Sequence, residues 1–190
     1  MPRSGADARR RLAAAALELY AEHGFEATTT AQIAERAGVN HRTFFRHFPD
    51  KREVLFDGEA DLSDTLATAT ADAPDDLTPF QALAVAFRTG ARILEENRPF
   101  SGPRLSIIAA TPALQERDLA KGESISRALA AALRRRGTPA EIADLAAHTG
   151  WATFHHAASQ WIDDPSQDLA THLDHALEVL HRLTGASATA

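Results

Sequence analysis

Three consecutive side chains near the N-terminus have the chemistry to contact nucleic acid. His41, Arg42 and Thr43 offer an imidazole, a guanidinium, and a hydroxyl beside a methyl group. A guanidinium can donate two hydrogen bonds to one guanine, and a threonine methyl can pack against the methyl of thymine. Thr29 and Thr30 add hydroxyls, which suit a phosphate when they lie at a helix N-terminus. These residue types favour bases and phosphates as the partner.

Two short helices must position these side chains. Thr29 followed by Gln32 forms a capping box, which predicts that a helix begins there. Gly38 interrupts that helix, Asn40 is a strong N-cap for a second one, and Pro49 ends the second. Two short helices joined by a glycine-containing turn of about three or four residues form a helix-turn-helix. The spacing therefore predicts this DNA-binding motif.

The second of these helices has an apolar side and a polar side. Phe44 and Phe48 lie four residues apart, so we expect both to face inward toward Ile33 and Ala34. The other side chains then lie on or near the open face, which enters the major groove in motifs of this kind. They are His41, Arg42, Thr43, Phe45, Arg46 and His47.

The charge of the chain is unevenly distributed. The net charge is −6, but residues 1–52 contain nine Lys or Arg against six Asp or Glu, a net +3. Residues 53–190 contain eleven against twenty, a net −9. Because phosphate contacts are screened beyond about 8–10 Å, we expect DNA to meet only the basic part. Arg9, Arg10 and Arg11 either contact phosphates or form a solvated charge run, and both interpretations stay open.

Helix-length segments fill the rest of the chain. Pro and Gly recur between stretches in which apolar residues repeat at helical spacing, such as Leu83, Phe87 and Leu94. We therefore predict an all-α protein of about nine helices. A three-helix, helix-turn-helix DNA-binding domain is expected at residues 1–52. A helical ligand-binding and dimerisation domain is expected at residues 53–190.

The stretch GFEATTTAQIAERAGVNHRTFFRHFPDK resembles the N-terminal domain of the TetR family of bacterial one-component transcription regulators. The shared pattern is G-F-x-A-T-T-x-x-x-I-A-x-x-A-G-V-x-x-x-T-F-F-x-H-F-x-x-K, and the likeness spans residues 9–56. Many fixed positions at fixed spacing make this pattern far more specific than a short motif. The resemblance implies a homodimer, a near-palindromic operator of double-stranded DNA, and a small-molecule pocket whose occupancy usually releases the DNA.

The resemblance also implies roles for single residues. Position 45, His47 and Lys51 match family positions that hold the DNA backbone. Phe45 stands where the family commonly has tyrosine, so the phenolic contact to phosphate is lost, which is expected to weaken binding without changing the fold. Together with the chemistry above, this gives the predicted DNA-binding residues, which are Thr29, Thr30, Asn40, His41, Arg42, Thr43, Phe45, His47 and Lys51.

The C-terminal part contains an aromatic stripe. Trp151, Phe154 and Trp161 share one helical face, which could line a ligand pocket, pack as core or meet a partner subunit. A pocket of apolar side chains with a few His and Arg suits a largely apolar effector. The segment RLSIIAATPAL and the alanine-rich helix ending RRRG resemble regulators of the mycofactocin type, a subgroup tied to acyl thioester ligands. The predicted ligand-binding residues are Phe87, Ile107, Trp151, Phe154 and His155.

Dimer contacts are expected near the C-terminus. In the family, the last two long helices usually form a four-helix bundle with their copies across a two-fold axis. The resemblance therefore implies Leu173, Leu177 and Leu180 as the dimer interface.

Histidines on the last two predicted helices suggest an alternative, a metal-responsive regulator of the same fold. They are His148, His155, His156, His172, His175 and His181. Two histidines seven residues apart could hold zinc or nickel together with a third from a neighbouring helix. No acidic residue lies three or four positions after His148 to complete such a site, so we predict no metal and no cofactor.

Several other classes lack support in the sequence. No GxSxG, Gly-rich phosphate loop or HExxH motif is present, so an enzyme is not expected. The chain has no cysteine, which excludes disulfides and thiolate chemistry. No apolar run approaches the roughly 20 residues that span a bilayer, and we expect a cytoplasmic protein with no membrane partner. The function predicted is a ligand-responsive DNA-binding regulator, most often a repressor in such systems.

Overall fold

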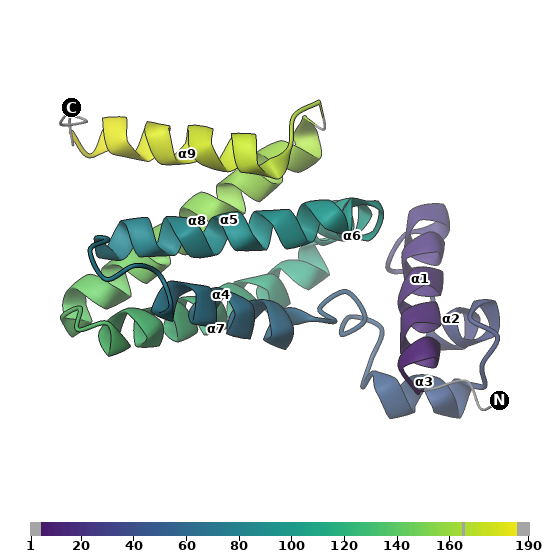
Figure 1. Ribbon diagram of the computed structural model, residues 1–190. Coiled ribbons are helices and arrows are strands. Elements are labelled where there is room, and N and C mark those ends of the chain that lie inside the picture. The colour runs from purple at the N-terminus through teal and green to yellow at the C-terminus, as the bar shows by residue number, and fades with distance from the viewer. Residues whose placement is uncertain (1–4, 165, 186–190) are drawn as a thin grey trace. The chain divides into compact units, whose positions relative to one another are not determined.

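The computed structural model describes residues 5–164 and 166–185 (Figure 1), and within them every regular element is an α-helix. This confirms the predicted all-α class of about nine helices. The helices are α1 (Gly5–His23), α2 (Thr30–Arg36), α3 (His41–His47), α4 (Glu59–Ala71), α5 (Pro79–Glu96), α6 (Arg98–Ala110), α7 (Pro112–Arg135), α8 (Ala140–Asp163) and α9 (Leu169–Leu183). None of these helices is long and apolar enough to cross a membrane.

Two compact units divide the described chain. The first comprises Met1–Glu59, as far as it is described, together with Pro99–Arg117. The second comprises Ala60–Arg98 and the described part of Asp118–Ala190. This division differs from the predicted boundary after residue 52, because residues from later in the chain join the N-terminal core. Ile108 and Leu114 are buried in the same apolar cluster as the helix-turn-helix.

The core of the first unit holds α1, α2 and α3 together. Leu12 of α1, Ile33 of α2 and Phe44 of α3 are completely buried and belong to one cluster. Gly38 has a φ of +65° in the turn between α2 and α3, a conformation that side chains with a Cβ rarely adopt. The three helices therefore pack as the sequence predicts, with the turn made by a residue suited to it.

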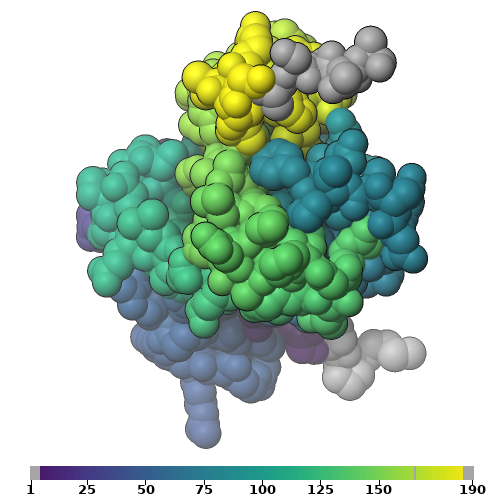
Figure 2. Space-filling model, turned by 90° about the vertical axis from the view of Figure 1, so that its left-hand side faces the viewer, coloured from purple at the N-terminus to yellow at the C-terminus, as the bar shows by residue number. Residues whose placement is uncertain are grey.

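The second unit is built around α5, α8 and α9, which pack against one another (Figures 1 and 2). α5 and α8 approach closely at Gly150, where an added Cβ would lie 3.0 Å from the Phe87 ring. Phe87 of α5 stacks on Phe154 of α8, with their ring centroids 5.2 Å apart. The rings of Phe87 and Phe154 fill the space between α5 and α8. Helix α9 (yellow in Figure 2) packs against both of these helices.

Candidate nucleic-acid interface

Side-chain caps fix the start of both short helices. The Thr29 hydroxyl oxygen accepts a hydrogen bond from the backbone N–H of Gln32, and the side-chain oxygen of Gln32 accepts one from the backbone N–H of Thr29. Asn40 Oδ1 accepts hydrogen bonds from the Thr43 amide at 2.8 Å and from the Thr43 hydroxyl at 2.9 Å. Each cap stabilises its helix by about 1 kcal/mol. The Thr43 hydroxyl proton is thereby committed, and its methyl remains the group suited to a thymine.

The inward face of α3 is apolar, as the sequence predicts. Phe44 and Phe48 are almost completely buried, with ring centroids 5.9 Å apart. Ile33 and Ala34 of α2 are buried in the same cluster. Seven residues are too few for a stable isolated helix, so this packing holds α3 in place.

Two arginines stand free on the outward face of α3. Arg42 and Arg46 are exposed and lie one turn apart. Within the described part of the chain, neither side chain has a hydrogen bond or an ion pair. Arg46 was absent from the predicted DNA-binding residues, although its four-residue spacing from Arg42 was a signal that could have included it. Two unpaired guanidinium groups on one face make a cationic surface.

His41 is held between the two helices. Its Nε2 atom lies 2.8 Å from the hydroxyl oxygen of Thr30 at the start of α2. Its ring also meets the ring of Phe45 edge-on, with centroids 5.0 Å apart. Phe45 is about 50% exposed, which is unusual for so large an apolar side chain. The structure thus brings together three of the predicted DNA-binding residues, Thr30, His41 and Phe45, at one edge of the helix-turn-helix.

Arg9 and Arg11 of α1 have partners within the protein. Arg9 forms an ion pair with Asp57 at 2.6 Å and donates a hydrogen bond to the carbonyl of His47. Arg11 donates to the carbonyl of Ala37 at 2.6 Å, at the end of α2. Both guanidinium groups therefore tie α1 to the two short helices.

His47 lies at the end of α3 in a partly buried position. Its Nε2 atom is shielded from solvent and has no hydrogen-bond partner in the described structure. Burial lowers the pKa of His47 below its usual value, and the nearby Arg46 and Arg9 charges lower it further. A neutral imidazole can still donate a hydrogen bond to a phosphate, but it adds no charge to that contact.

Lys51 makes contacts within the protein that the resemblance does not imply. Its ammonium donates to three main-chain carbonyls, those of Phe25 at 2.8 Å, Glu26 at 3.1 Å and Thr28 at 2.9 Å. It also lies 4.4 Å from the centroid of the Phe25 ring. An ammonium has three protons, and here all three are used inside the protein. These contacts form a clamp on residues 25–28, immediately before α2, and the phosphate contact of Lys51 stays a prediction.

Comparison with known proteins identifies the family. Residues 12–57 match the family model described as bacterial regulatory proteins of the tetR family, and residues 77–184 match the model described as MftR C-terminal domain. The chain belongs to the TetR family. Its members are transcription regulators and not enzymes. The second model covers the segment whose sequence resembles mycofactocin-type regulators.

Individual relatives agree with this assignment. The HTH-type transcriptional regulator TcmR of Streptomyces glaucescens is 41% identical over 80 residues, which cover 42% of this chain and 35% of TcmR. A crystal structure of Thermus thermophilus FadR in complex with lauroyl-CoA is 26% identical, covers 96% of both chains and gives a TM-score of 0.59. The SmeT–triclosan complex, from a Stenotrophomonas maltophilia repressor, shares 24% identity over 90% of both chains and the same fold, with a TM-score of 0.67.

The predicted ligand-binding residues of this TetR-family regulator lie in two places. Phe87 and Phe154 are buried and stacked between α5 and α8. Trp151 is half-buried beside Phe154, and His155 is exposed with its Nε2 atom 3.2 Å from an Asp118 oxygen. Ile107 belongs to the other unit and packs against the helix-turn-helix core. A pocket around Trp151 therefore remains a prediction for four of the five residues.

The predicted dimer residues differ in how accessible they are. Leu173 is fully buried inside the protomer, and Leu177 is nearly so, whereas Leu180 is partly exposed. Sequence reasoning missed two apolar side chains on the surface of α8, because they lie off the aromatic stripe. Ile142 is 52% exposed and Leu145 is 69% exposed.

Three histidines of α8 and α9, which are His148, His155 and His172, have separate partners. His148 lies with Nε2 3.2 Å from Glu123 and Nδ1 2.8 Å from the Asp144 carbonyl, and both contacts raise its pKa. His172 contacts the carbonyl of Asp164 instead. Among residues 5–164 and 166–185, no three His, Cys, Asp or Glu side chains gather to hold a metal ion. The metal-responsive alternative thus has no ligand set in the described structure.

Proposed function

We propose that this TetR-family protein is a repressor that binds a near-palindromic operator through α3 and leaves it when a small, largely apolar effector binds. The observation that carries the DNA-binding surface is the pair of free arginines, Arg42 and Arg46, on the outward face of α3. Guanidinium groups without protein partners are available for guanine edges or phosphates at no cost in broken ion pairs.

Preorganisation supports the same surface. Asn40 caps α3, Phe44 and Phe48 anchor it, and Thr30 holds His41 from the preceding helix. A recognition helix that is already ordered loses little conformational entropy when it binds. We therefore assign base reading to His41, Arg42 and Thr43, and contact with the DNA backbone to Thr29, Thr30 and His47.

Fluorescence anisotropy on operator DNA tests this assignment. The DNA is first selected from fragmented genomic DNA with the full chain, because the operator is unknown. Arg42→Ala should weaken binding to the selected site about 5- to 150-fold and relax the preference at one base pair. The matched control is Arg92→Ala, which removes an exposed arginine of α5. Equal affinities for the wild type and Arg42→Ala would refute the base-reading role.

The assembly proposed is a homodimer in which α8 and α9 of both copies meet. Leu145 is 69% exposed on α8, and Leu180 is partly exposed on α9. Large exposed apolar side chains are typical of interaction surfaces when they cluster. Leu145→Asp should give monomers in sedimentation velocity, whereas Leu119→Asp, which changes a 75% exposed leucine of α7, should leave the dimer intact. A wild-type monomer at micromolar concentration would contradict the proposal.

An acyl compound is the effector class that the comparisons favour. The FadR structure contains lauroyl-CoA and aligns with 96% of this chain at 26% identity. The half-buried Trp151 and the aromatic rings beside it could receive an apolar tail. Lauroyl-CoA should therefore release the selected operator DNA, and CoA without the acyl chain should not. If CoA alone released the DNA equally well, the apolar effector would be the wrong class.

A further inference from the structure

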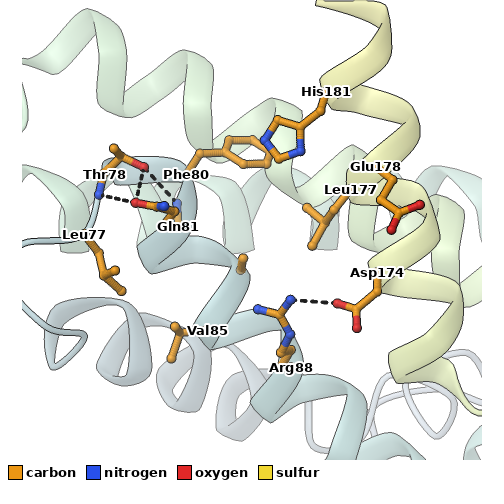
Figure 3. Close-up of a pocket in the computed structure, with 11 residues that line it drawn as sticks. Leu77, Thr78, Phe80, Gln81, Val85, Arg88, Asp174, Leu177, Glu178 and His181 are labelled. Atoms are coloured by element: carbon orange, nitrogen blue, oxygen red, sulfur yellow. Dashed lines mark hydrogen bonds and ion pairs between the residues drawn. The ribbon is translucent and has the colours of Figure 1, made fainter. Parts of the chain in front are cut away.

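A groove separates the first turns of α5 from the last turns of α9 in the second unit (Figure 3). Its volume is about 560 Å³. Small-molecule sites typically measure about 300–1,000 Å³, so the groove can hold one organic molecule of moderate size. None of the predicted effector-binding residues lines it. The groove is therefore a second place in the same unit where a small molecule fits.

One part of the groove is apolar. Leu77, Phe80 and Val85 lie on its α5 side, and Leu177 lies on its α9 side. Val85 is 37% exposed although it is a large apolar residue. Phe80 of α5 and His181 of α9 both line the groove, so each of its two sides carries a ring (Figure 3). These side chains suit the hydrocarbon or aromatic part of a ligand.

The charged side chains of the groove leave a negative excess. Arg88 Nη2 donates to Asp174 Oδ1 at 2.7 Å, and this pair is neutral as a whole. Glu178 follows Asp174 by one turn of α9, lines the same groove and has no ion pair or hydrogen bond within the described residues. Among the Asp, Glu, Lys and Arg side chains that line the groove, one carboxylate is therefore unbalanced. Charge complementarity therefore favours a cationic ligand over an anionic one.

We propose that this groove binds a small amphiphilic cation, whose positive group lies against Glu178 and whose apolar part covers Phe80 and Leu177. Asp174 provides a second acceptor at the expense of its bond with Arg88. This site is separate from the operator surface and from the residues around Trp151.

Two dyes of similar shape and opposite charge test the proposal. Rhodamine 6G is a cationic aromatic molecule, and fluorescein is an anionic one at pH 7.4. Fluorescence anisotropy with the full chain should show saturable binding of rhodamine 6G and much weaker binding of fluorescein. Glu178→Gln should weaken rhodamine 6G binding about threefold, the effect typical of one exposed charge pair. The matched control, Glu141→Gln, removes an exposed carboxylate at the start of α8 and should change nothing.

Reversing the charge of the groove gives the sharper result. Asp174→Asn combined with Glu178→Gln leaves Arg88 unpaired, so the groove changes from one negative to one positive charge. This double variant should lose rhodamine 6G binding and gain fluorescein binding, while its thermal unfolding stays like that of the wild type. Absence of rhodamine 6G binding in the wild type would overturn the proposal, as would equal binding by the double variant.

Two further outcomes would also overturn it. Rhodamine 6G binding that Trp151→Leu abolishes and Glu178→Gln leaves unchanged would place the dye at the predicted effector residues instead. Binding that weakens as the protein self-associates would show that a second copy of the chain occupies the groove. Operator binding is measured separately in each variant, so a failure of this site does not count against the DNA-binding function.

Discussion

Charged side chains near the helix-turn-helix and near the candidate sites of the second unit have different kinds of partner. In the first unit, Arg9, Arg11 and Lys51 donate to main-chain carbonyls of neighbouring segments. Around the candidate sites of the second unit, charged side chains pair mostly with one another, as Arg88 does with Asp174 and His148 with Glu123. A main-chain carbonyl is present whichever residue type occupies the position. An ion pair between two side chains, in contrast, can be lost or exchanged when both residues are substituted.

The kind of partner affects how easily a charged residue can be replaced. A long cation that reaches a fixed carbonyl can be replaced by few residue types, because length and the number of donors must both fit. A pair such as Arg88 and Asp174 on the surface contributes only about 0–1 kcal/mol and tolerates exchange. A contact such as the Lys51 clamp therefore constrains the local sequence more than the Arg88–Asp174 pair does.

Breaking the Lys51 clamp should lower both the stability of the protein and its affinity for the operator. Lys51→Met removes three charge-assisted hydrogen bonds and leaves three carbonyls to water, so we expect a loss of about 2–3 kcal/mol in the free energy of unfolding. For a chain of this size the melting temperature should fall by about 4–12 °C. Operator binding should weaken at least tenfold, because residues 25–28 no longer hold the start of α2. Differential scanning calorimetry and anisotropy measure the two losses.

Salt dependence separates the clamp from a phosphate contact. A lysine that neutralises one phosphate contributes about 0.9 to the slope of log K against log salt concentration. We expect the slope of Lys51→Met to match that of the wild type, whereas its stability falls. The neighbouring exposed cation provides the control, since Arg52→Met should leave the melting temperature nearly unchanged. If Lys51→Met instead had wild-type stability and a salt-dependence slope reduced by about one, the result would favour a phosphate contact for Lys51 over the clamp.

Trp151→Ala should have a smaller effect on stability and a selective effect on function. The indole lies against Gly122, where an added Cβ would come within 2.6 Å of its nitrogen, and it is half-buried rather than enclosed. We expect a loss of about 2 kcal/mol, less than the roughly 3–5 kcal/mol expected for the fully buried Trp161 in Trp161→Ala. Operator binding should survive, and more lauroyl-CoA should be needed for release. Equal losses from the two variants would favour packing as the sole role of Trp151.

The sequence predicted the first unit well because its signals are local. Thr29, Gly38 and Asn40 each fix a helix end through chemistry within four residues, and the structure places all three as expected. The clamp formed by Lys51 was not predicted, because its acceptors lie 23 to 26 residues away and are main-chain carbonyls, which no residue type in the sequence indicates.

The second unit was predictable in its helices and much less in its sites. Helical periodicity placed Phe87 and Phe154 inside, but it does not tell a core from a pocket wall. Ile107 was grouped with them although it packs in the first unit, since the chain returns to that unit between Pro99 and Arg117. The groove between α5 and α9 depends on contacts over about 90 residues, beyond the reach of any local pattern.

The smallest predicted effect concerns pH, and it has opposite signs in the two units. Burial lowers the pKa of His47, so the unfolded chain takes up the proton first and the protein loses stability as the pH falls through about 6.5. The Asp144 carbonyl and the Glu123 carboxylate raise the pKa of His148, so its contribution is fully present in acid and is lost as the pH rises through the folded value. His47→Gln should therefore reduce the loss of stability toward pH 5, and His148→Gln should increase it. Urea unfolding between pH 5 and 8 measures both, and NMR titration of the imidazole protons checks the direction of each shift. If both variants changed the pH dependence in the same direction, the contrast between a buried, unpartnered histidine and a surface histidine paired with a carboxylate would fail.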